Sequence, residues 1–180
     1  MKKLFLAMAL LVMSAAVQAQ IKNASLQASG LTCAMCSKAI YKALTAIPFI
    51  EKVTPDIEGS TYNIVFKNGA SVDPDALSKA VTGAGFSVAV LKLTTDFSDT
   101  KVKKDAHVTI GNKTFHFVDV KDQTLNGEKT ITLVDKNFIS AKAFKKYSQL
   151  TSMKCYQTGT MASCCPSGND SGKRVYHVTI

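Results

Sequence analysis

Cys33 and Cys36, two cysteines three residues apart, are the residues whose type and spacing most directly indicate chemistry. They belong to the segment GLTCAMC, residues 30–36. Two converging thiolates without a nearby histidine or carboxylate favour Cu(I), which accepts two or three soft ligands, over Zn(II), which takes four. Hg(II), Ag(I) and Zn(II) remain alternative ions for the same pair. We expect Met35, between the cysteines, to point to solvent or against the loop rather than to act as a third ligand.

A CxxC pair also allows redox chemistry. The alternative function is therefore a thiol–disulfide oxidoreductase that uses Cys33 and Cys36, and a structural disulfide is a further interpretation. Against a thioredoxin-like enzyme, the two intervening residues include no proline and no aromatic residue precedes Cys33. Metal binding is the interpretation that we carry forward.

The elements around the pair place it at the start of a helix. Residues 21–28 alternate like a strand and end at Ser29-Gly30, and apolar residues from Cys36 to Ile47 then follow helical spacing until Pro48. Cys33 would therefore lie in the loop and Cys36 in the first helical turn. The positive end of the helix dipole favours the deprotonated form of both thiols there.

The same half of the chain predicts four further elements. Strands are expected at residues 50–57 and 61–66, a helix after the capping pair Asp73-Pro74, and a last strand at residues 86–93. The order is β-α-β-β-α-β, which is the ferredoxin-like arrangement of the α+β class.

The motif GLTCAMC in this order of elements resembles the heavy-metal-associated (HMA) domains of copper chaperones, copper-transporting P-type ATPases and periplasmic mercury-binding proteins, whose pattern is GMTCxxC. The resemblance covers residues 21–93. It implies that Cys33 and Cys36 are the metal ligands, and that they pass the ion to a metal transporter or efflux component by stepwise thiolate exchange. Leu31 departs from the usual Met and is expected to preserve the packing beneath the loop. Phe86 is expected in a late loop near the site.

The second half of the chain has a different pattern. Residues 94–105, TTDFSDTKVKKD, form a polar and charged segment that we interpret as a linker. Residues 106–180 predict a small, mainly β domain with a hairpin turn at Gly111-Asn112 and one helix from Ser140 to about Leu150. Strands with a single helix among them suit an OB-like barrel.

Three further cysteines, Cys155, Cys164 and Cys165, lie near the C-terminus. The first interpretation is a disulfide between Cys155 and one of the vicinal pair. The second is another soft-metal site built from the three thiols, with Met161 as an additional donor. Five cysteines are an odd number, so complete intramolecular pairing is excluded.

The three histidines share no short ligand spacing. We expect each to be a partly buried strand residue rather than a ligand. The residues in question are His107, His116 and His177.

Residues 1–19 have the three-part layout of a secretory signal peptide, with Lys2 and Lys3 before a short apolar stretch and Ala19 at its end. We therefore expect a soluble protein outside the cytoplasm, in the periplasm, whose domains are residues 20–93 and 106–180. No later segment is long and apolar enough to span a bilayer. Without the first 19 residues, 20 basic and 13 acidic side chains leave a net charge of +7.

The basic side chains are not interleaved with aromatic ones, so nucleic-acid binding is not expected. No catalytic triad or phosphate-binding loop is apparent, and we expect a non-enzymatic protein. The sequence predicts an exported metal chaperone or scavenger, with a metal-bridged dimer as one arrangement that a two-cysteine site permits.

Overall fold

The structure is a computed structural model that describes residues 19–31, 34–163, 165 and 172–180. The predicted signal peptide, apart from Ala19, lies outside the described residues. Cys33 and Cys164 lie outside them as well.

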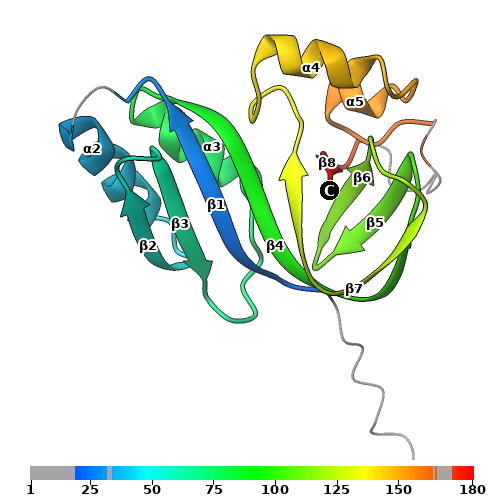
Figure 1. The fold of residues 1–180 in the computed structure, drawn as a ribbon, viewed down its shortest axis with the longest axis horizontal. Helices are drawn as coiled ribbons and strands as arrows, with labels where there is room; N and C mark the ends of the chain where they lie inside the picture. Colours follow the sequence, from blue (N-terminus) through cyan, green and yellow to red (C-terminus); the bar gives the residue numbers. More distant parts are fainter. Residues whose placement is uncertain (1–18, 32–33, 164, 166–171) are drawn as a thin grey trace, which may run out of the picture.

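The first half of the chain forms a four-stranded antiparallel sheet with two helices. Its elements are β1 (Ile21–Ser29), α2 (Ala34–Thr45), β2 (Ile50–Asp56), β3 (Thr61–Phe66), α3 (Pro74–Gly83) and β4 (Ser87–Val102). The strands lie in the order β2-β3-β1-β4, and Figure 1 shows the two helices on one face of them. The predicted βαββαβ order is confirmed.

Apolar side chains at helical spacing fix α2 to the sheet. Ile40 and Leu44 are fully buried and pack in one core with Leu26 and Ile64 from the strands. The start of α3 is also as predicted, because the Asp73 side chain accepts a hydrogen bond from the Asp75 backbone N–H at 3.2 Å.

The second half of the chain adds four strands to the same sheet. Its elements are β5 (Ala106–Ile110), β6 (Lys113–Phe117), β7 (Gln123–Leu133), α4 (Ala141–Ser148), α5 (Cys155–Thr158) and β8 (Val175–Thr179). The complete strand order is β2-β3-β1-β4-β7-β8-β6-β5, with β8 parallel to β6. The region is mainly β, as predicted, but the sheet stays open, and the predicted OB-like barrel is wrong.

The segment predicted to be a linker is mostly strand. β4 continues to Val102 and pairs with β7 along residues 92–102. Buried Thr95 and Phe97 alternate with exposed Asp96, so the charges that suggested a linker lie on the solvent face of a strand. The two halves therefore share a strand, whereas their assignment as separate domains stays a prediction.

The helices of the second half lie together above its strands in Figure 1. Ser140 caps α4 and accepts a hydrogen bond from the Ala143 backbone N–H at 3.3 Å, as the sequence indicated. The four-residue helix α5 was not anticipated. Among the residues that the structure describes, no helix is both long and apolar enough to cross a bilayer.

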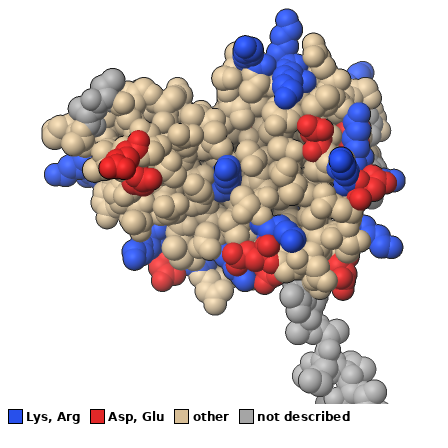
Figure 2. Space-filling view, viewed as in Figure 1, with Lys and Arg blue, Asp and Glu red and all other residues tan. Residues whose placement is uncertain are grey.

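Positive charge is spread over the surface. On the face drawn in Figure 2, basic side chains are interspersed with acidic ones, and a group of basic side chains lies at the top, over α4. That helix carries Lys142, Lys145 and Lys146. The picture agrees with a solvated basic surface.

Candidate metal centres

Cys36 lies in the first turn of α2 and is partly exposed. That turn holds no acidic side chain, so its backbone N–H groups favour a negatively charged sulfur. Met35 is 77% exposed, which confirms the expected direction of its side chain. Cys33 lies outside the described residues, so its position relative to Cys36 stays a prediction.

A buried hydroxyl fixes the start of α2 against the sheet. The Tyr62 Oη on β3 lies 3.2 Å from the Ser37 carbonyl oxygen and 3.0 Å from the Ser37 Oγ. Tyr62 and Ser37 are both buried, and Ser37 follows Cys36 directly. The sheet therefore sets the position of the helical turn that carries the cysteine.

The residues that flank the motif loop pack as expected. Leu31 is partly buried against the main core, so its substitution for the usual Met leaves an apolar contact in place. Gly30 has a φ of +84°, a backbone conformation that favours glycine. A Cβ at Gly30 would lie 4.0 Å from Phe86 Cδ1, which places Phe86 beside the entrance to the loop.

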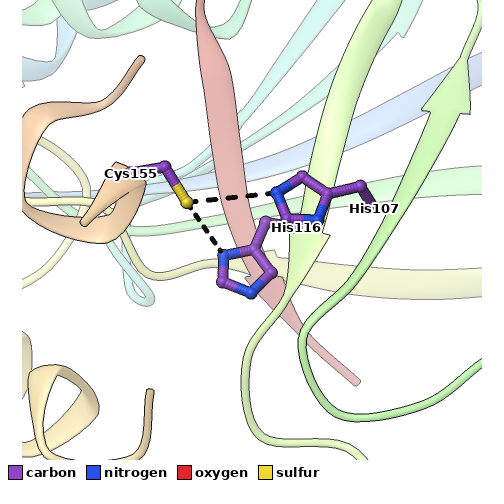
Figure 3. A group of neighbouring side chains, drawn as sticks. All are labelled: His107, His116 and Cys155. Atoms are coloured by element: carbon purple, nitrogen blue, oxygen red, sulfur yellow. Dashed lines mark hydrogen bonds between the residues drawn. The ribbon is translucent and has the colours of Figure 1, made fainter. Parts of the chain in front are cut away.

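A second group of soft donors lies in the C-terminal half. The side chains of His107, His116 and Cys155 converge, and their ligand atoms all lie within 4.8 Å of one another (Figure 3). The Cys155 Sγ is 3.9 Å from His107 Nε2 and 3.7 Å from His116 Nδ1. Cys155 and His116 are fully buried, and His107 is partly buried.

Strand register brings the histidines together. His107 on β5 pairs with His116 on β6, and His116 pairs with His177 on β8. The rings of His107 and His116 stack with 4.6 Å between centroids, and His177 meets His116 edge-on at 5.1 Å. The Gly111-Asn112 turn was a signal for the first pair, because a two-residue turn places His107 opposite His116. We expected strand histidines without ligand spacing, and that expectation overlooked the register.

Burial keeps the two rings nearest the sulfur neutral. It lowers the pKa of His116 to about 4, helped by neighbouring His177 and His107 and opposed by the Asp105 carboxylate. It also lowers the pKa of His107. Both rings are therefore uncharged at neutral pH, which is the form that binds metals.

Asp105 determines which nitrogen of His116 faces the sulfur. Its Oδ1 lies 3.0 Å from His116 Nε2. Since a carboxylate oxygen only accepts, Nε2 carries the proton, and the lone pair of Nδ1 is directed at Cys155.

His177 is held in the same way by another carboxylate. Asp135 accepts hydrogen bonds from the His177 ring at Nδ1, 2.9 Å away, and from the His177 backbone N–H at 2.8 Å. Burial alone would raise the pKa of Asp135, but the bonds to His177 and the charge of Arg174 lower it overall. Nε2 is therefore the ring nitrogen of His177 that Asp135 does not contact.

The C-terminal cysteines are only partly grouped as predicted. Cys155, Cys165 and Met161 are buried in one cluster with Val175. Cys164 lies outside the described residues, so a disulfide between it and Cys155 is not tested. The structure places Cys155 against two histidines, a combination that the sequence interpretation missed because the three residues come from distant segments.

Comparison with known proteins locates a family domain in the first half. The model of the heavy-metal-associated domain matches residues 25–87. The "Mercuric transport protein periplasmic component" of Serratia marcescens is 30% identical over 92 residues, which are 51% of this chain and 100% of that protein. The protein of the same name from Pseudomonas aeruginosa is 31% identical and covers 50% of this chain and 98% of its own length.

Among solved structures, oxidized MerP from Ralstonia metallidurans CH34 is 28% identical. The match covers 39% of this chain and 96% of that one, with a TM-score of 0.34. The curated relatives are matched over their full length or nearly so, and all of the matched residues fall within about half of this chain. The chain therefore belongs to the heavy-metal-associated domain family, with a mainly β region added after the family domain.

Proposed function

We propose that this protein is an exported, non-enzymatic carrier of a soft metal ion, which it binds through the thiolates of Cys33 and Cys36. The observation that carries the proposal is the place of Cys36, partly exposed in the first turn of α2 within the family domain. Cys33 precedes it by three residues, so a loop can bring the second sulfur to the same ion.

Cu(I) is our first candidate ion. Two thiolates at a helix N-terminus satisfy its preference for few, soft ligands, and no histidine or carboxylate adjoins the motif in the sequence. An ion held at a partly exposed turn can pass to the thiolates of a transporter or efflux component one ligand at a time. The same exposure would allow two molecules to share one ion.

Hg(II) is the second candidate, and a specific observation favours it. The curated relatives reported above are named as periplasmic components of mercuric transport. Their names also support the periplasmic location that the N-terminal residues predict. Hg(II) is as thiophilic as Cu(I) and is likewise satisfied by a pair of thiolates, so the ligands are the same for both ions.

The test is a competition among metals on the reduced, full-length protein in a Cys155→Ser background, which removes the other soft cluster. Cu(I), Hg(II), Ag(I) and Zn(II) are titrated against one another, and bound metal is measured by mass spectrometry under native conditions. We expect one Cu(I) per chain in preference to Zn(II), and loss of that equivalent with Cys33→Ser or Cys36→Ser. Met35→Leu is the matched control and should bind as the parent does.

Three outcomes would redirect the proposal. Preferential retention of Hg(II) in the presence of buffered Cu(I) would make mercury the cargo. Catalytic turnover in an insulin-reduction assay that depends on both cysteines would establish the oxidoreductase alternative. Metal binding that survives both cysteine substitutions would exclude the pair as the ligands.

A further inference from the structure

We propose that His107, His116 and Cys155 form a second metal site, which binds one copper ion in the C-terminal half of the protein. The site is separate from Cys33 and Cys36 in ligand chemistry and in sequence. It also replaces the all-thiol set predicted for the C-terminal cysteines with two ring nitrogens and one sulfur.

The distances suit a metal bound by three ligands. Bonds of about 2.3 Å to sulfur and about 2.0 Å to nitrogen separate the sulfur and nitrogen ligands of a trigonal ion by roughly 3.7 Å. The observed separations from Cys155 Sγ are 3.7 Å to His116 and 3.9 Å to His107. The rings of His107 and His116 are stacked with 3° between their planes, so they would tilt toward each other to bind one ion.

The tautomer of His116 leaves a ring lone pair directed at the sulfur. The Asp105 carboxylate places the His116 proton on Nε2, so His116 presents an acceptor to Cys155. A cation would bring this lone pair together with one on His107 and with the Cys155 thiolate. The carboxylate behind His116 is the outer partner typical of metal-bound histidine.

A second observation indicates a ligand nearby. His177 is fully buried, and its Nε2 has no hydrogen-bond partner among the residues that the structure describes. Its ring packs edge-on against His116. Buried polar atoms without a partner are rare in native proteins, and a bound ion or water is one explanation for them.

The surroundings favour copper over zinc. Zinc with three protein ligands normally keeps a water molecule as its fourth, but Cys155 lies in an apolar cluster with Met161, Cys165 and Val175. Two imidazoles and one thiolate, with a methionine sulfur as a weak additional donor, form a set that proteins use for copper. Binding would release the Cys155 thiol proton.

The experiment uses the full-length, reduced protein with Cys33→Ser and Cys36→Ser, so that only the C-terminal cluster can supply this site. Cu(I) is titrated against a chromophoric Cu(I) chelator, and the copper form is examined by X-ray absorption. We expect one Cu(I) per chain, bound by one sulfur and two nitrogens. Cys155→Ser should weaken binding by at least about 100-fold, beyond the roughly 10–100-fold effect of an outer partner.

Cys165→Ser is the matched control, because Cys165 lies in the same cluster but is not among the converging donors. It should leave the affinity unchanged, and circular dichroism verifies the fold of each variant. The X-ray absorption spectrum does not depend on ligand variants, so it decides the case even if Cys155→Ser fails to fold.

The proposal is overturned if the reduced protein binds no copper, if the ion has only sulfur ligands, or if Zn(II) displaces Cu(I). A disulfide that holds Cys155 in the isolated protein would overturn it as well. Any of these results leaves the function proposed for Cys33 and Cys36 intact, because that pair is absent from the protein tested.

Discussion

At the scale of single residues, carboxylates set the state of the buried histidines. Asp105 accepts a hydrogen bond from the His116 ring, and Asp135 accepts one from the His177 ring. The two carboxylates therefore contact opposite ring nitrogens, Nε2 in His116 and Nδ1 in His177. The carboxylates contact the histidines and are not among the proposed metal ligands. Substituting a carboxylate therefore tests how the histidine is oriented without removing a ligand.

Asp105 provides the first test at this scale. Its φ of +61° is easily adopted by glycine, so Asp105→Gly should remove the carboxylate without backbone strain. We expect copper affinity at the C-terminal cluster to fall about 10–100-fold, because His116 loses its outer partner. Asp105→Asn keeps an acceptor oxygen and should lose less. Equal affinities in chelator competition for all three proteins would contradict this role.

A substitution of Asp135 provides the second test at the scale of single residues. Asp135 is buried beside the fully buried His177 and the partly exposed Arg174, so Asp135→Asn should lower the free energy of unfolding at pH 7 by about 3 kcal/mol, the lower end of the range for a buried ion pair that loses one partner. Because folding lowers the pKa of Asp135, its stabilisation is complete well above pH 4 and is lost as the pH falls through that lowered pKa.

Urea unfolding of the parent and Asp135→Asn at pH values from 7 to 2 measures this dependence. The difference between the two proteins should shrink only at the acidic end of the series. A difference that is constant across the series would show that the carboxylate charge is not the source of the stabilisation.

At the scale of elements, the position of Cys36 depends on how α2 begins. Tyr62 on β3 contacts the first turn of α2 at Ser37. Further along the helix, Ile40 and Leu44 are buried against the sheet. In the C-terminal half, α5 has the corresponding role. It begins at Cys155, is capped after Thr158 by Gly159 with a φ of +71°, and directs the cysteine toward the strands that carry the histidines.

Tyr62→Phe tests the link between β3 and α2. The change removes a buried hydroxyl that contacts Ser37, and we expect the free energy of unfolding to fall by about 0.5–1.5 kcal/mol. Tyr41→Phe is the matched control, because Tyr41 is exposed on the same helix. Urea denaturation should separate the two variants, and a loss of equal size in both would reject a specific contact.

At the scale of the whole molecule, two features join the halves. β4 pairs with β1 on one side and with β7 on the other, so a single strand crosses the boundary. Arg174, the only arginine in the chain, contacts Asp75 on α3 at 2.9 Å and Asp135 after β7 at 3.1 Å. These residues line a cleft of about 1120 Å³ between α3 and the α4–α5 region.

Arg174→Lys tests this connection. Lysine cannot reproduce the two-pronged contact in which Nε and Nη2 meet both oxygens of Asp75. We expect the free energy of unfolding to fall by about 1.5–3 kcal/mol. A double-mutant cycle with Asp75→Asn is the control, and the two losses should be less than additive. Strict additivity in thermal or urea unfolding would show that the pair is not coupled.

The sequence by itself determined the elements whose signals are local. The spacing from Cys36 to Ile47 gave α2, Asp73-Pro74 gave the start of α3, and Gly111-Asn112 gave the turn between β5 and β6. The assignment of the motif cysteines as ligands rests on equally local signals, a loop and one helical turn, and it stays a prediction because Cys33 lies outside the described residues. These features depend on periodicity and capping over a few residues.

Only the tertiary structure decided the course of β4 and the composition of the second cluster. The polar composition of residues 94–105 predicted a linker. Most of the segment is instead a strand, because it pairs with β7 and buries Phe97 while its polar side chains face solvent. Cys155 contacts His116 and His107, which precede it by 39 and 48 residues. The contact forms because β5 and β6 are neighbours in the sheet and α5 packs against them. No local pattern encodes that meeting, since it depends on strand order and on the packing of α5 over the sheet.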